Sequence, residues 1–193
     1  MSRIVAVEYL SIDGRMEMED PEGKEKELGG WTAPYWNDEL QTMQYDQLFA
    51  SDALLLGRVT YQGFAASWPS ITDEQGFADR MNNLPKYVAS TTLTEPLEWN
   101  ATLLHGDPVE EVRKLKQQPG RDILIYGSGE LVRTLLAHDL VDVLRLIVHP
   151  VVLGRGKRLF EDGAMSGFKL TGSQATRTGV VALTYQVAGD HAD

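Results

Sequence analysis

Three short polar segments each follow an apolar run of the kind that forms a buried β-strand. They are Gly57-Arg58-Val59-Thr60, Ser90-Thr91-Thr92 and Gly127-Ser128-Gly129. A helix that starts directly after such a segment leaves backbone N–H groups free, and the positive end of its dipole lies at the same point. This junction suits a phosphate group. Arg58 adds a forked donor, and we expect Thr60 to cap the next helix while facing the phosphate.

A second interpretation of these segments involves no ligand. A tight strand-to-helix turn also needs glycine, and serine or threonine hydroxyls often cap turns. For each segment by itself, residue types and spacing leave both interpretations open. The position of the segments relative to one another has to decide between them.

Asp13 is the acidic residue that we assign to the substrate side. It follows the first strand, where a carboxyl group could act as a general acid or orient a substrate. The alternative is a simple Asp-Gly turn. Further on, the polar segment 15–30 is either a binding loop or a solvated excursion, and Trp31, Tyr35 and Trp36 after it either line a pocket for a planar substrate or anchor the loop.

Composition restricts the classes of function. The chain has 193 residues, which we interpret as a single domain over 1–193, and a net charge of −10, which argues against nucleic-acid partners and anionic membranes. It has no cysteine, and His105 and His149 stand alone at strand ends, so we interpret them as structural and expect no metal site. Without a signal-peptide pattern or a long apolar run, we expect a cytoplasmic protein.

Strand-like and helix-like patterns alternate along most of the chain. Strands are expected at 3–10, 53–56, 86–89, 102–104, 123–126, 140–148, 168–175 and 180–188. Helices are expected at 38–50, 61–66, 73–82, 109–117 and 130–138. This order predicts an α/β fold with a mixed sheet, mostly parallel and finished by antiparallel C-terminal strands, with helices on both faces.

In such a sheet the carboxyl ends of neighbouring strands meet at one crevice. Three phosphate-compatible junctions at one crevice suggest an extended ligand such as a dinucleotide. No Gly-x-Gly-x-x-Gly follows the first strand, so the fingerprint of the Rossmann fold is absent.

At this point the sequence resembles the dihydrofolate-reductase-like superfamily. It looks closest to the group that includes the C-terminal reductase domain of the bifunctional riboflavin-biosynthesis protein, a 5-amino-6-(5-phosphoribosylamino)uracil reductase. The segments that carry the resemblance span nearly the whole chain: Ser11-x-Asp13-Gly14, Leu56-Gly57-Arg58-Val59-Thr60-Tyr61, Lys86-Tyr87-Val88-Ala89-Ser90-Thr91-Thr92-Leu93, Ile125-Tyr126-Gly127-Ser128-Gly129, Leu140-Val141-Asp142 and Pro150-Val151-Val152-Leu153-Gly154-x-Gly156-x-x-Leu159-Phe160.

The resemblance implies an NADPH-dependent reductase of a small heterocyclic or carbonyl substrate. Gly57, Arg58 and Thr60 match the junction that holds the cofactor's phosphates. The segment Ser90-Thr91-Thr92 matches the part that meets the adenosine end and its 2′-phosphate, and Gly127-Ser128-Gly129 matches the turn against the pyrophosphate and nicotinamide side. The resemblance also implies a homodimer formed through the C-terminal strands.

Two departures from the family pattern keep other functions open. Gln41 stands where a dihydrofolate reductase carries a buried acid, with Asp38 and Glu39 slightly upstream, and we assign Gln41 and Trp36 to the substrate side. The residues that would hold a substrate phosphate are not obvious. The alternatives are a non-catalytic nucleotide-binding module of the same fold, or a reductase that acts beside a separate deaminase. The basic candidates, for which ordinary surface charge beside a glycine loop is the favoured alternative, are Arg15, Arg155, Lys157 and Arg158.

Overall fold

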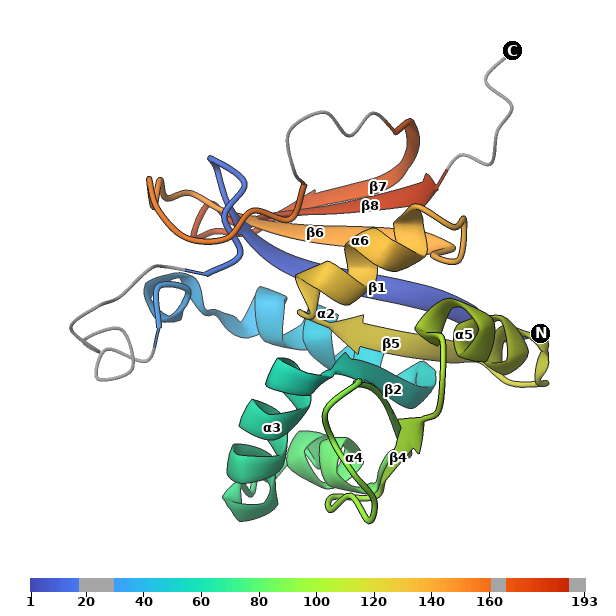
Figure 1. Cartoon of the computed structure of the whole chain (residues 1–193). Coiled ribbons are helices and arrows are strands. Elements are labelled where there is room, and N and C mark those ends of the chain that lie inside the picture. Colours follow the sequence, from blue (N-terminus) through green and yellow to red (C-terminus); the bar gives the residue numbers. More distant parts are fainter. Residues whose placement is uncertain (18–29, 161–165, 188–193) are drawn as a thin grey trace.

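One mixed sheet of eight strands organises the part of the chain that the computed structural model describes, residues 1–17, 30–160 and 166–187. The strands lie in the order β4-β3-β2-β5-β1-β6-β8-β7 (Figure 1). Their bounds are β1 Arg3–Ser11, β2 Ser51–Gly57, β3 Lys86–Ala89, β4 Ala101–Leu104, β5 Asp122–Tyr126, β6 Val143–His149, β7 Phe168–Ala175 and β8 Val181–Val187.

The first strand lies near the centre of the sheet. It pairs with β5 on one side and β6 on the other, in parallel on both. The pairs β2–β5, β2–β3 and β3–β4 are also parallel, whereas β8 runs antiparallel to β6 and β7. The predicted mixed sheet with antiparallel C-terminal strands is therefore confirmed.

Five α-helices connect the strands of the described chain. They are α2 Asp38–Phe49, α3 Arg58–Ser67, α4 Phe77–Asn83, α5 Pro108–Gln117 and α6 Gly129–Leu136. Asn37 caps α2, because its Oδ1 accepts a hydrogen bond from Leu40 N at 2.9 Å. Asp107 caps α5 in the same way, through Val109 N at 2.9 Å. Within the described residues, no helix is both long enough and apolar enough to span a bilayer.

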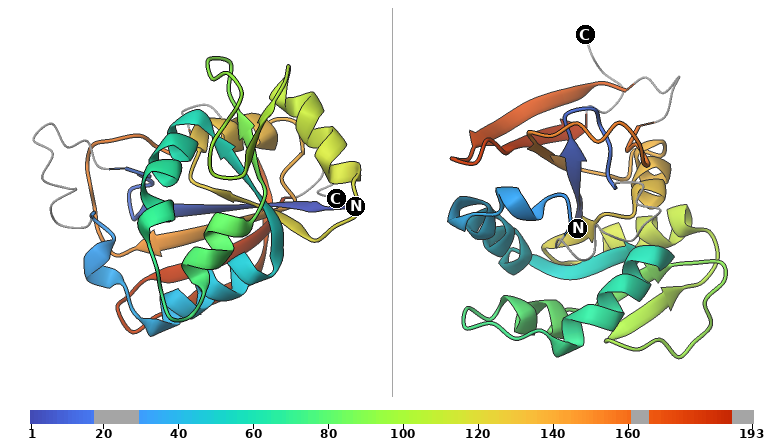
Figure 2. Two further views of the ribbon diagram at one scale, coloured as in Figure 1. Left: turned by 90° about the horizontal axis from the view of Figure 1, so that it is seen from below. Right: turned by 90° about the vertical axis from the view of Figure 1, so that its left-hand side faces the viewer.

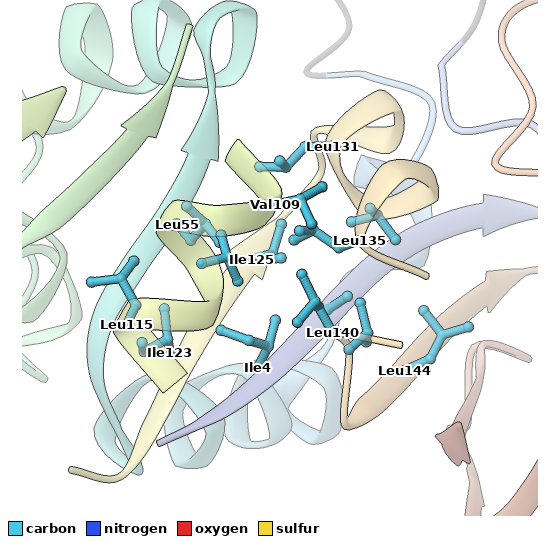
Figure 3. Packing of buried hydrophobic residues seen from close by; sticks show 14 of the residues in the cluster. Ile4, Leu55, Val109, Leu115, Ile123, Ile125, Leu131, Leu135, Leu140 and Leu144 are labelled. Atoms are coloured by element: carbon cyan, nitrogen blue, oxygen red, sulfur yellow. The ribbon is translucent and has the colours of Figure 1, made fainter. Parts of the chain in front are cut away.

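The helices cover both faces of the sheet, as predicted. One core lies between the strands and the pair α5 and α6, and it includes Ile4, Leu55 and Ile125 (Figure 3). A second core lies on the opposite face, against α2, α3 and α4. The right-hand view of Figure 2 shows α2 on one side of β1 and α6 on the other. Successive side chains of β1 point to opposite faces of the sheet, so the strand contributes to both cores: Ile4 lies in the first and Val5 in the second.

Several expected boundaries differ from the structure by a few residues, and two of them have a visible cause. β6 begins at Val143, because Asp142 Oδ2 instead accepts a hydrogen bond from Ile4 N at 2.7 Å and fixes the approach to the strand. α4 begins at Phe77 rather than near Asp73, although the Asp73 carboxylate does reach the helix start through Phe77 N at 3.0 Å. Most of the segment 15–30, interpreted from its sequence as a binding loop or excursion, lies outside the described residues.

Glu8 is an unusual member of the central strand. It lies on β1 and is completely buried. Among the described residues, neither of its carboxylate oxygens has a hydrogen-bond partner. Burial disfavours the charged carboxylate, and it raises the pKa of Glu8 well above the ordinary value of 4.5. The folded protein therefore holds Glu8 in its protonated form at pH values where the unfolded chain would release the proton.

This difference makes stability depend on pH. The stabilising contribution of the raised pKa is fully present below pH 4.5 and is lost as the pH rises toward the folded-state pKa. We expect the unfolding free energy of the wild type, relative to Glu8→Gln, to fall by up to about 1.4 kcal/mol per pH unit between pH 4.5 and the folded-state pKa of Glu8. Urea unfolding at several pH values measures it. The exposed Glu98→Gln serves as the control, and parallel profiles for wild type and Glu8→Gln would contradict the prediction.

Candidate cofactor and substrate site

The sheet brings the three polar junctions to one edge. Gly57 ends β2, Ser90 follows β3, and Gly127 follows β5. These three strands are neighbours in the order β3-β2-β5 and run parallel, so their carboxyl ends lie side by side. This strand order agrees with the sequence-based expectation that the three junctions lie at the same edge of the sheet.

The Ser128 side chain joins two of the junctions. Its Oγ accepts a hydrogen bond from Gly57 N at 2.8 Å and donates one to Thr60 Oγ1 at 2.9 Å. A Cβ at position 57 would lie 3.3 Å from the Cβ and Oγ of Ser128, so a side chain there would press on this contact. The expected cap by Thr60 is therefore wrong, because Thr60 is the third residue of α3 and its hydroxyl accepts from Ser128.

The backbone of this turn is held in an uncommon conformation. Gly127 has φ +58° and Ser128 has φ +61°, so two successive residues occupy the left-handed region. For a residue other than glycine this region is unfavourable by about 1 kcal/mol or more. The two hydrogen bonds of the Ser128 hydroxyl hold the strained conformation in place. The turn is thereby rigid and aims the start of α6 at the edge of the sheet.

Two helices start at this edge without side-chain caps. Gly57 precedes α3 and Ser128 precedes α6, and neither helix start receives a side-chain hydrogen bond from its capping residue. The capping residues thus leave the first N–H groups of both helices without a side-chain acceptor, and both positive dipole ends lie beside the Gly57–Ser128 contact. This arrangement fits an anionic group such as a pyrophosphate, which accepts hydrogen bonds from several N–H groups together.

The other cofactor-side candidates make local contacts. Ser90 Oγ accepts hydrogen bonds from Thr92 N and Leu93 N, both at 3.1 Å, so this hydroxyl closes its own turn. Thr91 and Thr92 are exposed to solvent. Arg58 is also exposed, and its Nη1 donates to Gln62 Oε1 at 3.2 Å, one helical turn away. An exposed guanidinium with such a contact can rearrange to meet an anion at low energetic expense.

A cavity of about 700 Å³ lies on the face of the sheet that carries α2, α3 and α4. Trp36 and Gln41, both assigned to the substrate side from sequence, line it. Its wall also includes Tyr9, Phe64, Trp68, Phe77 and Tyr126. The sequence analysis missed these five because they come from separate strands and helices and each fits a core position. These aromatic side chains come together as one wall only in the folded chain.

The cavity adjoins the uncapped helix starts. Tyr126 is the last residue of β5, directly before Gly127, and Phe64 lies one helical turn beyond Thr60 on α3. Burial raises the pKa of the Tyr9 and Tyr126 hydroxyls, so both stay protonated at neutral pH. The Tyr126 hydroxyl is itself buried, and an interaction with the Gln47 side chain partly offsets the effect of burial on its pKa. Tyr126 is therefore a neutral phenol in the cavity wall, next to the junction at Gly127.

The contacts of Asp13 favour the turn interpretation. Its carboxylate accepts hydrogen bonds from Ser11 Oγ at 2.7 Å, Leu153 N at 3.0 Å and Gly154 N at 2.9 Å. These bonds, the one from Ser11 above all, lower the pKa of Asp13 far below its ordinary range. The group is ionised at neutral pH and does not line the cavity. Asp13 thus ties the end of β1 to the segment after β6.

The basic candidates lie near the contact between Asp13 and the segment after β6. Arg15 Nη1 donates to Gly156 O at 2.7 Å, and Lys157 Nζ lies 3.4 Å from a Glu17 carboxylate oxygen. None of the four basic candidates lines the cavity. Trp31 and Tyr35 pack edge-on against the ring of buried His149, at centroid distances of 5.1 and 5.9 Å. Of the three aromatic residues after segment 15–30, only Trp36 lines the cavity.

Known structures share this architecture. A putative riboflavin biosynthesis protein from Shewanella sp. PV-4 matches with a TM-score of 0.68 and 18% identity, over 97% of this chain and 99% of that one. A dihydrofolate reductase from Enterococcus faecalis, complexed with NADP(H) and RAB-propyl, matches with a TM-score of 0.62 and 15% identity over 97% of both chains. The fold is therefore that of the dihydrofolate-reductase-like proteins.

The sequence places the chain more narrowly. The family model of the RibD C-terminal domain matches residues 3–182, and the chain belongs to this family. The uncharacterized protein YyaP of Bacillus subtilis (strain 168) is 35% identical over 148 residues, which cover 75% of this chain and 78% of YyaP. The resemblance stated from sequence motifs is confirmed at the level of family and fold.

The Ser128 hydroxyl makes the junction testable. We expect Ser128→Ala to lower the unfolding free energy by about 1–3 kcal/mol, because Gly57 N–H loses its partner in a partly buried position. The control is Ser70→Ala, whose exposed hydroxyl bonds Ser67 O and whose loss should change stability by about 0.5 kcal/mol or less. Urea unfolding compares the two. Equal, small effects would show that the Ser128 contact does not hold the turn.

Proposed function

We propose that this protein is an NADPH-dependent reductase that transfers a hydride to a small heterocyclic or carbonyl substrate. The observation that carries the proposal is the position of two uncapped helix starts, those of α3 and α6, directly beside an open aromatic cavity. An anion-compatible edge next to a pocket of substrate size is what a reductase with a dinucleotide cofactor needs. Membership of the RibD C-terminal domain family supports the same activity.

Each junction has a proposed part in holding the cofactor. The N–H groups at the starts of α3 and α6 bind the pyrophosphate, with Gly57, Thr60 and Ser128 shaping the surface. Gly127 and Gly129 let the backbone come close. Arg58, with Ser90, Thr91 and Thr92 at the neighbouring strand end, meets the adenosine side and its 2′-phosphate. When bound, NADPH would supply the hydride.

The protein's own groups would position the substrate and control protons. Trp36, Phe64 and Trp68 would hold a planar substrate and exclude water from its faces. The Tyr126 hydroxyl, which stays protonated, would donate a hydrogen bond to the atom that gains negative charge. Gln41 adds an amide at the rim, where its Nε2 now donates to Gln75 Oε1 at 3.0 Å. Asp13 is ionised and therefore cannot give a proton at neutral pH.

A non-catalytic nucleotide-binding module is the alternative function. Such a module would need no substrate pocket, and apolar side chains would fill the space beside the junctions. The cavity of about 700 Å³ favours catalysis over this alternative. For assembly, we propose a homodimer through the C-terminal strands, where Leu170 on β7 is 51% exposed.

The proposal predicts selective cofactor binding. Titration of the purified protein with NADPH and NADH, followed by tryptophan fluorescence, should show tighter binding of NADPH. Arg58→Ala should weaken the binding of NADPH by about tenfold and the binding of NADH much less. The reason is that a charge-assisted contact to the 2′-phosphate contributes about 1.4 kcal/mol or more to the binding free energy of NADPH.

Arg113→Ala is the matched control, since Arg113 is also a solvent-exposed helical arginine, and its Nη1 lies 2.6 Å from Oε1 of Glu110 on α5. Equal losses for both cofactors in Arg58→Ala would remove Arg58 from recognition of the 2′-phosphate. If the wild type binds neither cofactor, the junctions are turns only and the proposed function is wrong.

A further inference from the structure

The charges around the cavity carry information about its ligand. Half of the residues that line it are aromatic, and among these lining residues there is no lysine, arginine or histidine. A phosphate or carboxylate that enters such a wall loses its hydration and finds no cation to replace it. The wall by itself therefore selects against anionic substrates.

The mouth of the cavity adds negative charge. Asp73 and Glu74 both line it and both are exposed. The Asp73 carboxylate accepts hydrogen bonds from the backbone N–H groups of Ala78, Phe77 and Gln75, and these lower its pKa. Asp73 is thus held in its ionised form at the entrance. An approaching phosphate meets like charge there, in addition to the net charge of −10.

Three cations on this side of the described chain, Lys86, Arg145 and Arg80, are bound to other groups. The Lys86 ammonium donates to Asn82 O at 2.7 Å and lies 4.1 Å from the centre of the Trp99 ring. Arg145 Nη1 donates to Gln47 Oε1 at 2.8 Å, and the Arg80 guanidinium bonds Ser51 O. Lys86 is completely buried, so it cannot reach into the cavity without leaving its strand. These cations are held in the fold and do not compensate for the acidic mouth.

The polar groups that do line the interior are neutral. Tyr126 in the wall is a buried, neutral phenol, and Gln44 on α2 is almost fully buried at the cavity wall. Phenol and amide groups recognise carbonyl oxygens, ring nitrogens and amino groups without requiring a charge. Phe64 and Trp68, in edge contact at 6.3 Å, supply flat apolar surface.

We infer that the cavity binds a flat ring system that carries hydrogen-bonding groups but no phosphate or carboxylate. This inference rests on the proposed function, because it names the substrate class of the proposed reductase. It departs from the phosphoribosyl substrate that the sequence resemblance implies. The anionic part of the assembly is confined to the helix starts of α3 and α6, and the substrate side is neutral inside and acidic at its mouth.

The test compares matched ligands that differ by one phosphate. Riboflavin against riboflavin 5′-phosphate and uridine against uridine 5′-phosphate are titrated into the full-length protein without NADPH, by isothermal calorimetry. We expect the unphosphorylated member to bind at least about tenfold more tightly in at least one pair. If the phosphorylated member binds equally or better, or if no member of either pair binds, the inference is wrong.

A charge variant separates the acidic mouth from other causes. Glu74→Lys should reduce the discrimination against phosphate several-fold, because it replaces a carboxylate at the mouth with a cation. Glu98→Lys makes the same change in charge outside the cavity lining and should leave the ratio unchanged. Tyr126→Phe should weaken the binding of the unphosphorylated ligand several-fold, because it removes the hydroxyl group as a hydrogen-bond donor. An unchanged ratio in Glu74→Lys would overturn the part assigned to the mouth.

The two proposals fail in different ways. NADPH binding without preference for the unphosphorylated ligand would leave the reductase proposal standing and overturn the substrate class. Preference for the unphosphorylated ligand without binding of NADPH or NADH would do the reverse, because the pocket would then be a neutral binding site in a protein that is not a reductase.

Discussion

The hydroxyl of Ser128 is the contact on which the arrangement of the candidate site depends. It bonds Gly57 N and Thr60 Oγ1 from a residue that is itself in the left-handed region. Because β2 and β5 are neighbours, this one group sets the positions of two helix starts at once. A ligand that needs both helices meets a surface that is already formed, which reduces the ordering required on binding.

Alternation along the central strands divides the molecule into a structural face and a functional face. On one face, Ile4 and Ile125 pack beneath α5 and α6 and fill the space. On the other face, Tyr9 and Tyr126 alternate with those residues and face a cavity that α2, α3 and α4 leave open. The same two strands thus support a close-packed core and the floor of a pocket, and residue size on each face decides which one forms.

Local signals in the sequence were sufficient for the order of elements, the mixed sheet and the three junctions. Asn37, Asp107 and the glycines give such signals because their effect reaches only a few residues. The pocket wall could not be predicted in the same way. Phe64, Phe77 and Tyr126 each fit an ordinary core position, and only their spatial meeting makes a cavity. Asp13 shows the same limit, because its partners Leu153 and Gly154 are 140 and 141 residues away in the sequence.

The position of β1 has a consequence for how the chain is made. During synthesis β1 emerges long before its neighbours β5 and β6, which begin only at Asp122 and Val143. Until they emerge, this largely buried strand has two open edges. Such edges pair with other chains as readily as with their own. Nascent chains that stop before β5 are therefore the form of this protein most exposed to aggregation, and β5, which covers the first edge of β1, also brings Tyr126 and Ser128 to the site.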